Sequence, residues 1–354
     1  MTKMKRRRLQ PRDYTVGWIC ALPLELQAAT KILDEEHDDL PQEANHPNLY
    51  TLGRISGHNV VIVCLPAGYI GTNSAAATIS QMKSKFPSIQ YNLMVGIGGG
   101  VPCAETDIRL GDVVVSQPHL GRSGVVQYDF GKSMPGGFER TSFLNAPPTL
   151  LLSALSKLQA DNRKLRSQLS LSLSAFNCER NQAGPDLLFE STYNHVGGPE
   201  CDGCNKERLV PRMTQDSHEI TIHYGTIASG NQVIRDGVTR DKISSELGGV
   251  LCFEMEAAGL MNNFPCLVIR GISDYADSHK NNKWQSYAAA TAAAYAREVL
   301  SVIPVTEITA TCPVGDAGIF VREAFPYPHE GGSLRLISRC LTGHRKYSNP
   351  VLTV

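Results

Sequence analysis

Carboxylates follow two apolar runs in the second half of the chain. Glu254 and Glu256 come directly after the run 250–253, and Asp274 follows the run 266–269. Both runs are continuously hydrophobic, which is typical of parallel strands buried on both faces. Because ligand sites in open α/β sheets form at the carboxyl ends of strands, these acids are candidates for acid–base chemistry.

The same acids could serve the fold alone. Glu254 and Glu256 would open a helix through 257–262, where acids in the first turn interact favourably with the helix dipole. Ser273 and Asp274 could cap a turn. The spacing by itself leaves the catalytic and the structural interpretation open.

A third carboxylate stands near the amino terminus. The run Tyr14–Ile19 predicts a strand, and Pro23 predicts the start of the helix that follows it. Glu25 falls in the first turn of that helix, soon after the strand ends. On its own, this position suits an acid that compensates the helix dipole.

The elements that position these acids alternate along the chain. Further strands are predicted over 59–65, 92–95, 110–116 and 220–229, and helices over 74–86, 147–175 and 284–302. Such alternation predicts an α/β fold with a mostly parallel, helix-flanked sheet. The turn Gly96–Gly100 would let the backbone approach a ligand closely, but it matches neither a dinucleotide-binding fingerprint nor a P-loop.

Composition excludes several classes of protein. The chain has 354 residues with 34 basic and 34 acidic side chains, so a broad nucleic-acid footprint is not expected. It lacks an apolar run of about 18 residues and a signal peptide, so we expect no membrane partner. The ten cysteines are scattered, several of them in apolar strands. They indicate reduced thiols in an intracellular, cytoplasmic protein.

The two ends differ from the central part in composition. Residues 1–12 predict a disordered basic tail, residues 13–303 one α/β domain, and residues 304–354, with few periodic apolar runs, a tail of unknown role. A nuclear localisation signal is an alternative interpretation of the basic cluster. Its residues are Lys3, Lys5, Arg6, Arg7 and Arg8.

An irregular insertion is predicted at about 176–219, long enough to be a lid, a binding loop or a disordered segment. It contains His195, Cys201 and Cys204. These three could be part of a zinc site, with Cys178 or His218 as the fourth ligand. Because a single CxxC is weak support, we predict no metal and no cofactor and keep zinc as the less favoured alternative.

Six segments resemble one known family in type and order. They are GWICALPLELQAA, VGIGGGVP, IRLGDVVVS, ASGNQVIRDG, FEMEAAGL and VIRGISDYAD. Over about 14–303 the chain resembles the nucleoside phosphorylase/nucleosidase superfamily and is similar to its methylthioadenosine/S-adenosylhomocysteine nucleosidase branch. It looks especially like fungal domains found at the amino terminus of NACHT, ankyrin or tetratricopeptide-repeat proteins. No such repeats follow, so we expect a stand-alone or shortened version.

The resemblance implies a three-layer helix–sheet–helix fold with a mixed, mostly parallel central sheet. It also implies catalytic roles: Asp274 would protonate the purine N7 as the glycosidic bond breaks, Ser273 would hold that carboxyl group, and Glu25 would activate the attacking water. An acid and a base on opposite faces suit a reaction through an oxocarbenium-like sugar. To stay protonated, Asp274 needs burial or a like-charged neighbour such as Asp277.

The same resemblance implies binding roles and a small-molecule partner. Glu256 would bind the ribose hydroxyls with Met255 against the sugar, and Gly98 and Gly99 would line the sugar side. Gln232 and Val233 occupy the region where the family often has a base-stacking aromatic residue. The implied ligand is a purine nucleoside or nucleotide. A homo-oligomer is expected by analogy only.

Hydrolysis is preferred to phosphorolysis. Phosphorylases of the family place cations after the first strand, whereas this chain has no basic residue there before Lys31 and has Glu25 instead. A carboxylate repels phosphate but can activate water. We therefore predict a purine nucleosidase, with adenine the favoured base and Arg235 and Arg240 available to a phosphorylated 5′ end. A purine nucleoside phosphorylase and a non-catalytic nucleoside-sensing module are the alternatives.

Overall fold

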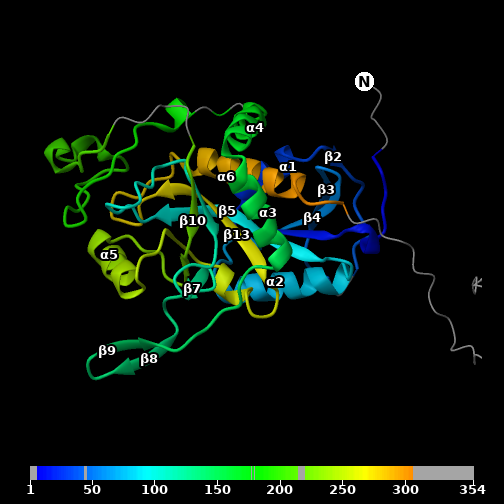
Figure 1. Ribbon diagram of the computed structural model, residues 1–354, viewed down its shortest axis with the longest axis horizontal. Coiled ribbons are helices and arrows are strands. Elements are labelled where there is room, and N and C mark those ends of the chain that lie inside the picture. Colours follow the sequence, from blue (N-terminus) through cyan, green and yellow to red (C-terminus); the bar gives the residue numbers. More distant parts are fainter. Residues whose placement is uncertain (1–5, 44–45, 177, 179, 214–219, 306–354) are drawn as a thin grey trace, which may run out of the picture. The chain divides into compact units, whose positions relative to one another are not determined.

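The computed structural model describes residues 6–43, 46–176, 178, 180–213 and 220–305 (Figure 1). Its strands are β1 (Val16–Cys20), β2 (Glu35–Glu36), β3 (Tyr50–Ile55), β4 (His58–Cys64), β5 (Tyr91–Gly100), β6 (Val113–Ser116), β7 (Val125–Gln127), β8 (Gly131–Met134), β9 (Gly137–Arg140), β10 (Ile222–Gly225), β11 (Ile227–Ser229), β12 (Cys252–Glu254) and β13 (Cys266–Asp274). Its α-helices are α1 (Pro23–Lys31), α2 (Thr72–Lys85), α3 (Thr149–Ala160), α4 (Asn162–Ser174), α5 (Gly237–Glu246) and α6 (Gln285–Ser301). Among these, none is long and apolar enough to cross a bilayer.

A mixed sheet of eleven strands forms the middle layer. Its main path runs β10-β6-β13-β5-β1-β4-β3-β2, and β12, β11 and β7 branch from β5. Strands β4, β1, β5 and β13 run parallel, whereas β6 is antiparallel to β13. The predicted mixed, mostly parallel sheet is confirmed.

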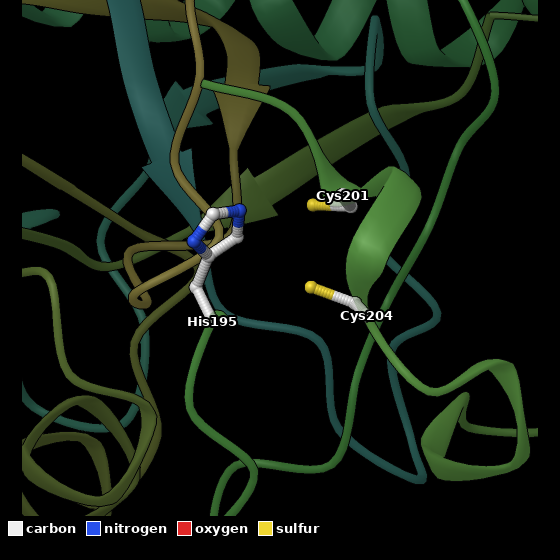
Figure 2. A group of neighbouring side chains, drawn as sticks. All are labelled: His195, Cys201 and Cys204. Carbon is white, nitrogen blue, oxygen red and sulfur yellow. The ribbon is translucent and has the colours of Figure 1, made fainter. Parts of the chain in front are cut away.

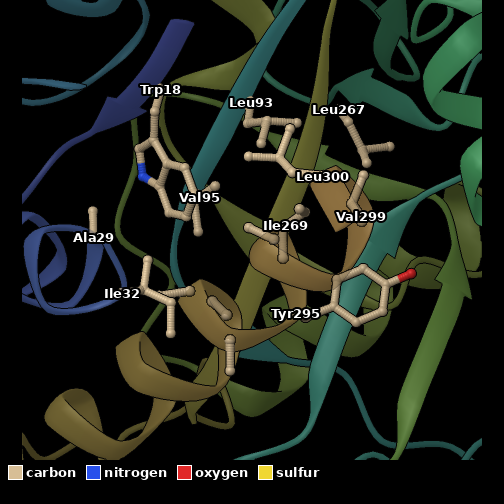
Figure 3. Packing of buried hydrophobic residues seen from close by; sticks show 14 of the residues in the cluster. Trp18, Ala29, Ile32, Leu93, Val95, Leu267, Ile269, Tyr295, Val299 and Leu300 are labelled. Carbon is tan, nitrogen blue, oxygen red and sulfur yellow. The ribbon is translucent and has the colours of Figure 1, made fainter. Parts of the chain in front are cut away.

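Both faces of the sheet are buried, which explains the continuous apolar runs. Trp18 of β1 packs in the cluster with α1, α3, α4 and α6, while the next residue, Ile19, packs in the cluster with α2. Figure 3 shows part of the first cluster, in which Leu93, Leu267 and Tyr295 come from β5, β13 and α6. The three layers are therefore helix, sheet and helix (Figure 1).

The strand around 250–253 differs from the prediction. It was expected to run parallel, but β12 pairs antiparallel with β5, through Cys252 opposite Gly100 and Phe253 opposite Gly99, and parallel only with β11. Nor does a helix follow over 257–262, since only the short 3₁₀ turn Ala257–Gly259 forms there. This arrangement turns the acids after β12 toward the end of β5.

Two predicted continuous elements are each split in the structure. The helix over 147–175 breaks at Asp161, whose carboxylate accepts a hydrogen bond from the Lys164 N–H at 3.2 Å and caps α4. The strand over 220–229 divides at Thr226 into β10, which pairs with β6, and β11, which pairs with β12 and β7. The prediction also missed β3, the β8–β9 hairpin and α5.

Part of the predicted disordered basic tail is ordered. Arg7 forms a β-bridge with His37, and Arg6 and Arg7 form ion pairs with Glu36 and Glu35, respectively. These contacts place Arg6 and Arg7 beside β2, and Pro11–Asp13 forms a 3₁₀ turn, so the structure differs from the disorder predicted for residues 6–12. Lys3, Lys5, His218 and residues 306–354 lie outside the described part of the chain.

Candidate active site

A cavity of about 220 Å3 opens where β5, β12 and β13 end and α1 begins. All the residues predicted to act in catalysis or to bind the sugar and the base lie in its wall, whereas Arg235 and Arg240 do not. Those in the wall are Glu25, Gly98, Gly99, Gln232, Val233, Met255, Glu256, Ser273 and Asp274. The tertiary structure thus brings together residues from five separate parts of the sequence.

Arg270 lies at the centre of the charged groups in this wall. Its side chain extends from β13 and is 1% exposed. Its Nη2 lies 2.5 Å from Glu254 and 3.3 Å from Glu256, and its Nη1 lies 4.0 Å from Glu25. Although burial alone would lower the pKa of Arg270, the three carboxylates raise it overall, so the guanidinium stays charged.

Glu25 is held by backbone donors as well as by Arg270. Its Oε2 accepts hydrogen bonds from the N–H groups of Ala21 and Leu22 at 2.7 and 2.9 Å, and its Oε1 accepts one from Ile97 at 2.8 Å. Glu25 therefore does cap α1, as the structural interpretation expected. Burial nevertheless raises its pKa, against the opposing effect of Arg270, so the carboxylate can accept a proton in the cavity.

Glu254 and Glu256 follow β12 and share Arg270. Glu254 also accepts hydrogen bonds from the N–H groups of Glu256 and Ala257, which gives it a structural role. Besides its bond from Arg270, Glu256 accepts a long hydrogen bond of 3.3 Å from the Gly71 N–H. Burial raises the pKa of Glu256 to about 7, with Arg270 lowering it and Glu254 and Glu25 raising it further. Three acids thus share one guanidinium, and burial favours the protonated forms of Glu25 and Glu256.

The close approach of Glu25 and Arg270 depends on Gly96. In the β5–β13 register, Arg270 stands opposite Gly96. A Cβ atom at Gly96 would lie 2.3 Å from Glu25 Oε1 and 2.5 Å from Arg270 Nη1. Similarly, a Cβ at Gly99 would lie 2.8 Å from Asp274 Oδ1. These glycines lie within β5, and not in a turn as predicted, and they make room for charged protein groups.

Asp274 ends β13 and is 5% exposed. Its Oδ2 accepts hydrogen bonds from the Ser273 hydroxyl at 2.9 Å and the Lys280 ammonium at 2.8 Å, and its Oδ1 accepts the Ala276 N–H at 2.9 Å. Ala276 has φ of 51°, a left-handed conformation that is uncommon for a non-glycine residue and is found most often at functional sites.

Asp277 was proposed as a neighbour that keeps Asp274 protonated. Its own contacts are with Arg240 Nη1 at 3.9 Å and His279 Nδ1 at 3.7 Å. The group that instead contacts Asp274 is the Lys280 ammonium, of opposite charge. The expected like-charged environment is therefore replaced by an ion pair.

Several residues of the site were missed or left without a role. No role was predicted for Arg270 or for Lys280. Phe253 also lines the cavity and supplies an aromatic ring, which Gln232 and Val233 do not. Arginine inside the apolar run of β13 was the available signal, because a buried charge requires partners.

The insertion places a second group of side chains together. His195, Cys201 and Cys204 each bring a ligand atom to within 4.8 Å of the others (Figure 2). Cys178, proposed as a fourth ligand, packs instead against the hydrophobic core. Between 180 and 213 the insertion has only 3₁₀ turns and one β-bridge, from Phe189 to Leu209.

Known proteins share this fold and sequence pattern. A fungal relative from Hyaloscypha variabilis, described as a nucleotide-binding leucine-rich repeat (NLR)-like protein, is 48% identical over 307 residues, or 85% of this chain. The Escherichia coli protein described as ATP nucleosidase Cap17 is 29% identical over 283 residues, or 78% of this chain. This chain spans only 30% and 48% of the lengths of these two relatives, respectively.

A solved structure of similar fold comes from Borrelia burgdorferi. It is a putative 5′-methylthioadenosine/S-adenosylhomocysteine nucleosidase bound to adenine, with a TM-score of 0.55 and 20% identity over 82% of this chain and 100% of that one. The profile of the phosphorylase superfamily matches residues 15–188 and 189–303. The match covers most of the chain, so this protein belongs to the phosphorylase superfamily.

Proposed function

We propose that this chain is a purine nucleosidase, which hydrolyses the N-glycosidic bond of a nucleoside or nucleotide, with adenine the favoured base. The observation that carries the proposal is the meeting of Glu25, Glu256 and Asp274 in the wall of one cavity. In this proposal Asp274 protonates the departing base, Glu25 takes a proton from water, and Glu256 binds the ribose hydroxyls.

The charge balance of the cavity suits this reaction. As the glycosidic bond breaks, the sugar becomes oxocarbenium-like and gains positive charge. Glu25, Glu254 and Glu256 surround the single guanidinium of Arg270. Backbone hydrogen bonds hold the carboxyl groups of Glu25 and Glu254 in place, and acidic groups fixed in this way stabilise the developing cation.

Proton donation by Asp274 requires a change at Lys280. An ammonium 2.8 Å from the Asp274 carboxylate opposes its protonation. Lys280 sits in a loop after β13 with its side chain only partly buried, so it can move to the substrate when one binds. The exchange would leave Asp274 with the Ser273 hydroxyl and the Ala276 N–H.

The same contacts favour water over phosphate as the second substrate. The cations in the cavity wall are Arg270 and Lys280. Arg270 is already surrounded by three carboxylates, and Glu25 stands beside it. Phosphate bound there would meet negative charge, whereas water would meet a carboxylate able to accept its proton.

A phosphorylated 5′ end fits a neighbouring cavity. Lys280 also lines this second cavity, of about 570 Å3, together with Arg235 and Lys283. Arg240, the other predicted candidate, is 3% exposed and donates to Asp241 and to the Tyr275 carbonyl, so it is not available. The E. coli relative described as an ATP nucleosidase adds support for nucleotide substrates.

The direct test is incubation of the purified protein with adenosine, inosine, methylthioadenosine and ATP, each with and without phosphate. We expect free adenine and free ribose, or 5′-substituted ribose, without phosphate. The Glu25→Gln variant should lose base release, and Glu139→Gln, on the exposed β8–β9 hairpin, should keep it. Release only with phosphate, giving a sugar 1-phosphate, would contradict the hydrolytic role of Glu25.

A nucleoside-sensing module is the second candidate, favoured by the NLR-like description of the fungal relative. Such a module would bind the nucleoside without cleaving it. Calorimetric binding of adenosine or ATP with no base released over many hours would support it. Turnover by the parent protein and its loss in Asp274→Asn would exclude a purely non-catalytic role.

A further inference from the structure

The three-residue cluster in the insertion has the composition of a metal site. Cys201 and Cys204 lie on and directly after a 3₁₀ turn, Cys201–Gly203, and are 9% and 4% exposed. Figure 2 shows both sulfur atoms and the His195 ring pointing into one gap. Two thiolates at C-x2-C spacing with one imidazole supply three of the four ligands of a closed zinc site.

A second histidine from another part of the chain stands beside this cluster. The ring of His279, in the loop after β13, lies 5.6 Å from that of His195, between centroids. His279 also shares with Cys201 the wall of a cavity of about 80 Å3. It is 7% exposed, and neither ring nitrogen has a hydrogen-bond partner among the described residues. Buried imidazole nitrogens normally have partners, so a ligand is indicated.

The environment of His279 matches that of a metal-binding histidine. Asp277 Oδ1 lies 3.7 Å from His279 Nδ1. Metal-binding histidines commonly have a carboxylate near the ring nitrogen that does not bind the metal. The ring also stacks on Phe189, with centroids 4.1 Å apart and planes 15° apart, which fixes its orientation.

Apart from Ala183 and Leu188, which pack against the main core, the insertion buries few apolar side chains. Its own hydrophobic cluster has only Phe189, Cys201 and Cys204 as buried members. A core of this size does not offset the entropy of ordering a long irregular segment. Zinc at a structural site supplies folding free energy directly, because the metal binds only the ordered ligand set.

We infer that His195, Cys201, Cys204 and His279 bind one Zn2+ ion, which joins the insertion to the loop after β13. On binding, the two thiols release their protons to solvent, and the two thiolates balance the charge of the ion. The role is structural, since four protein ligands leave no open position for substrate.

Other contacts also join the insertion to the loop after β13, in agreement with a shared zinc ion. The His195 N–H donates to Ser278 Oγ at 3.0 Å, and Glu200 forms an ion pair with Lys283 at 2.7 Å. The His195 Nε2 lies 3.2 Å from the Glu200 carbonyl oxygen, a contact that a metal would replace. His279 precedes Lys280, which contacts Asp274, so the ion would also position that lysine.

The test is the metal content of the full chain, purified without a polyhistidine tag and dialysed against metal-free buffer. We expect about one zinc per chain by mass spectrometry, and loss of zinc in Cys201→Ser, Cys204→Ser and His279→Ala. Cys103→Ser, at an exposed cysteine outside the cluster, is the matched control and should keep its zinc. Cobalt substitution should give the absorption of a tetrahedral thiolate site.

A second measurement uses the unmutated protein, so its result does not depend on whether the variants fold. Iodoacetamide should modify Cys201 and Cys204 slowly before, and rapidly after, removal of metal with a chelator, as mapped by peptide mass. Absence of bound zinc or cobalt in the parent protein would overturn the inference. So would a Cys201–Cys204 disulfide, or equal alkylation with and without chelator. Full zinc in His279→Ala would overturn the assignment of the fourth ligand.

Discussion

The cavity at the ends of β5, β12 and β13 and the insertion over 180–213 are neighbours, but different forces hold them. In the cavity, side chains extend from core elements, and backbone N–H groups of Ala21, Leu22 and Ile97 fix the Glu25 carboxylate. In the insertion, side chains extend from turns, and its ion pair between Glu200 and Lys283 is nearly half exposed at both ends.

This difference predicts how strongly single substitutions will affect each region. A buried charged group that loses its partner is costly, because water cannot replace the interaction. A solvent-exposed ion pair loses little when it breaks. We therefore expect large effects from single changes in the cavity and small effects in the insertion, except at the four proposed metal ligands.

The largest effect is expected at Asp274. Asp274→Asn removes the proposed proton donor and should lower turnover by about 10²- to 10⁴-fold, the usual contribution of general acid catalysis. Nucleoside binding should stay largely intact, since the amide keeps the shape of the carboxyl group. Base release in single-turnover experiments and calorimetric binding measure the two quantities separately. Unchanged turnover would exclude Asp274 as the acid.

Glu256 should make stability depend on pH. Its pKa is about 7 in the folded protein against an ordinary value of 4.5. Between these values the folded state keeps a proton that the unfolded chain has lost, so stability is highest at low pH and falls as pH rises through this window, by up to about 3 kcal/mol.

Glu256→Gln removes this titration. The free energy of unfolding of the variant, minus that of the parent, should therefore rise between pH 4.5 and pH 7. Urea unfolding at several pH values measures it, with Glu105→Gln, at an exposed acid, as the control. A difference independent of pH would show that folding does not raise the pKa of Glu256.

Gly96→Ala should displace charged groups in the cavity wall. The new methyl group would lie 2.3 Å from Glu25 Oε1, so Glu25 and Arg270 must separate. We expect a loss of about 1–3 kcal/mol in the free energy of unfolding, together with reduced turnover. Gly136→Ala is the matched control, because a Cβ there has no atom within 4 Å. Equal stability of the two variants would mean that the charged groups are not tightly held.

The smallest effect is expected at Glu200. Glu200→Gln breaks the exposed ion pair with Lys283 and should change the free energy of unfolding by less than about 1 kcal/mol. Limited proteolysis within 185–213 should be unchanged, whereas Cys204→Ser should make this segment sensitive. If Glu200→Gln exposed the segment equally, surface charge rather than a metal would hold the insertion.

Much of the cavity wall could be predicted from the sequence because parallel strands end at one edge of a sheet. This rule accounts for Glu25 and Asp274, which follow the parallel strands β1 and β13, whereas Glu256 reaches the same wall through the antiparallel strand β12. The same approach failed for the helix expected after Glu256 and for the parallel pairing of 250–253. Both depend on β12 adding to the far end of β5, a long-range contact that local patterns do not encode.

The sequence by itself determined the α/β class, through buried apolar runs alternating with helical segments, and the chemical types at the strand ends. Only the tertiary structure decided which groups interact. The β5–β13 register sets Arg270 opposite Gly96 and so beside three acids, and a turn returns Lys280 to Asp274. The tertiary structure also brings His279 next to His195. Such contacts join residues distant in sequence, and their geometry arises only when the core packs.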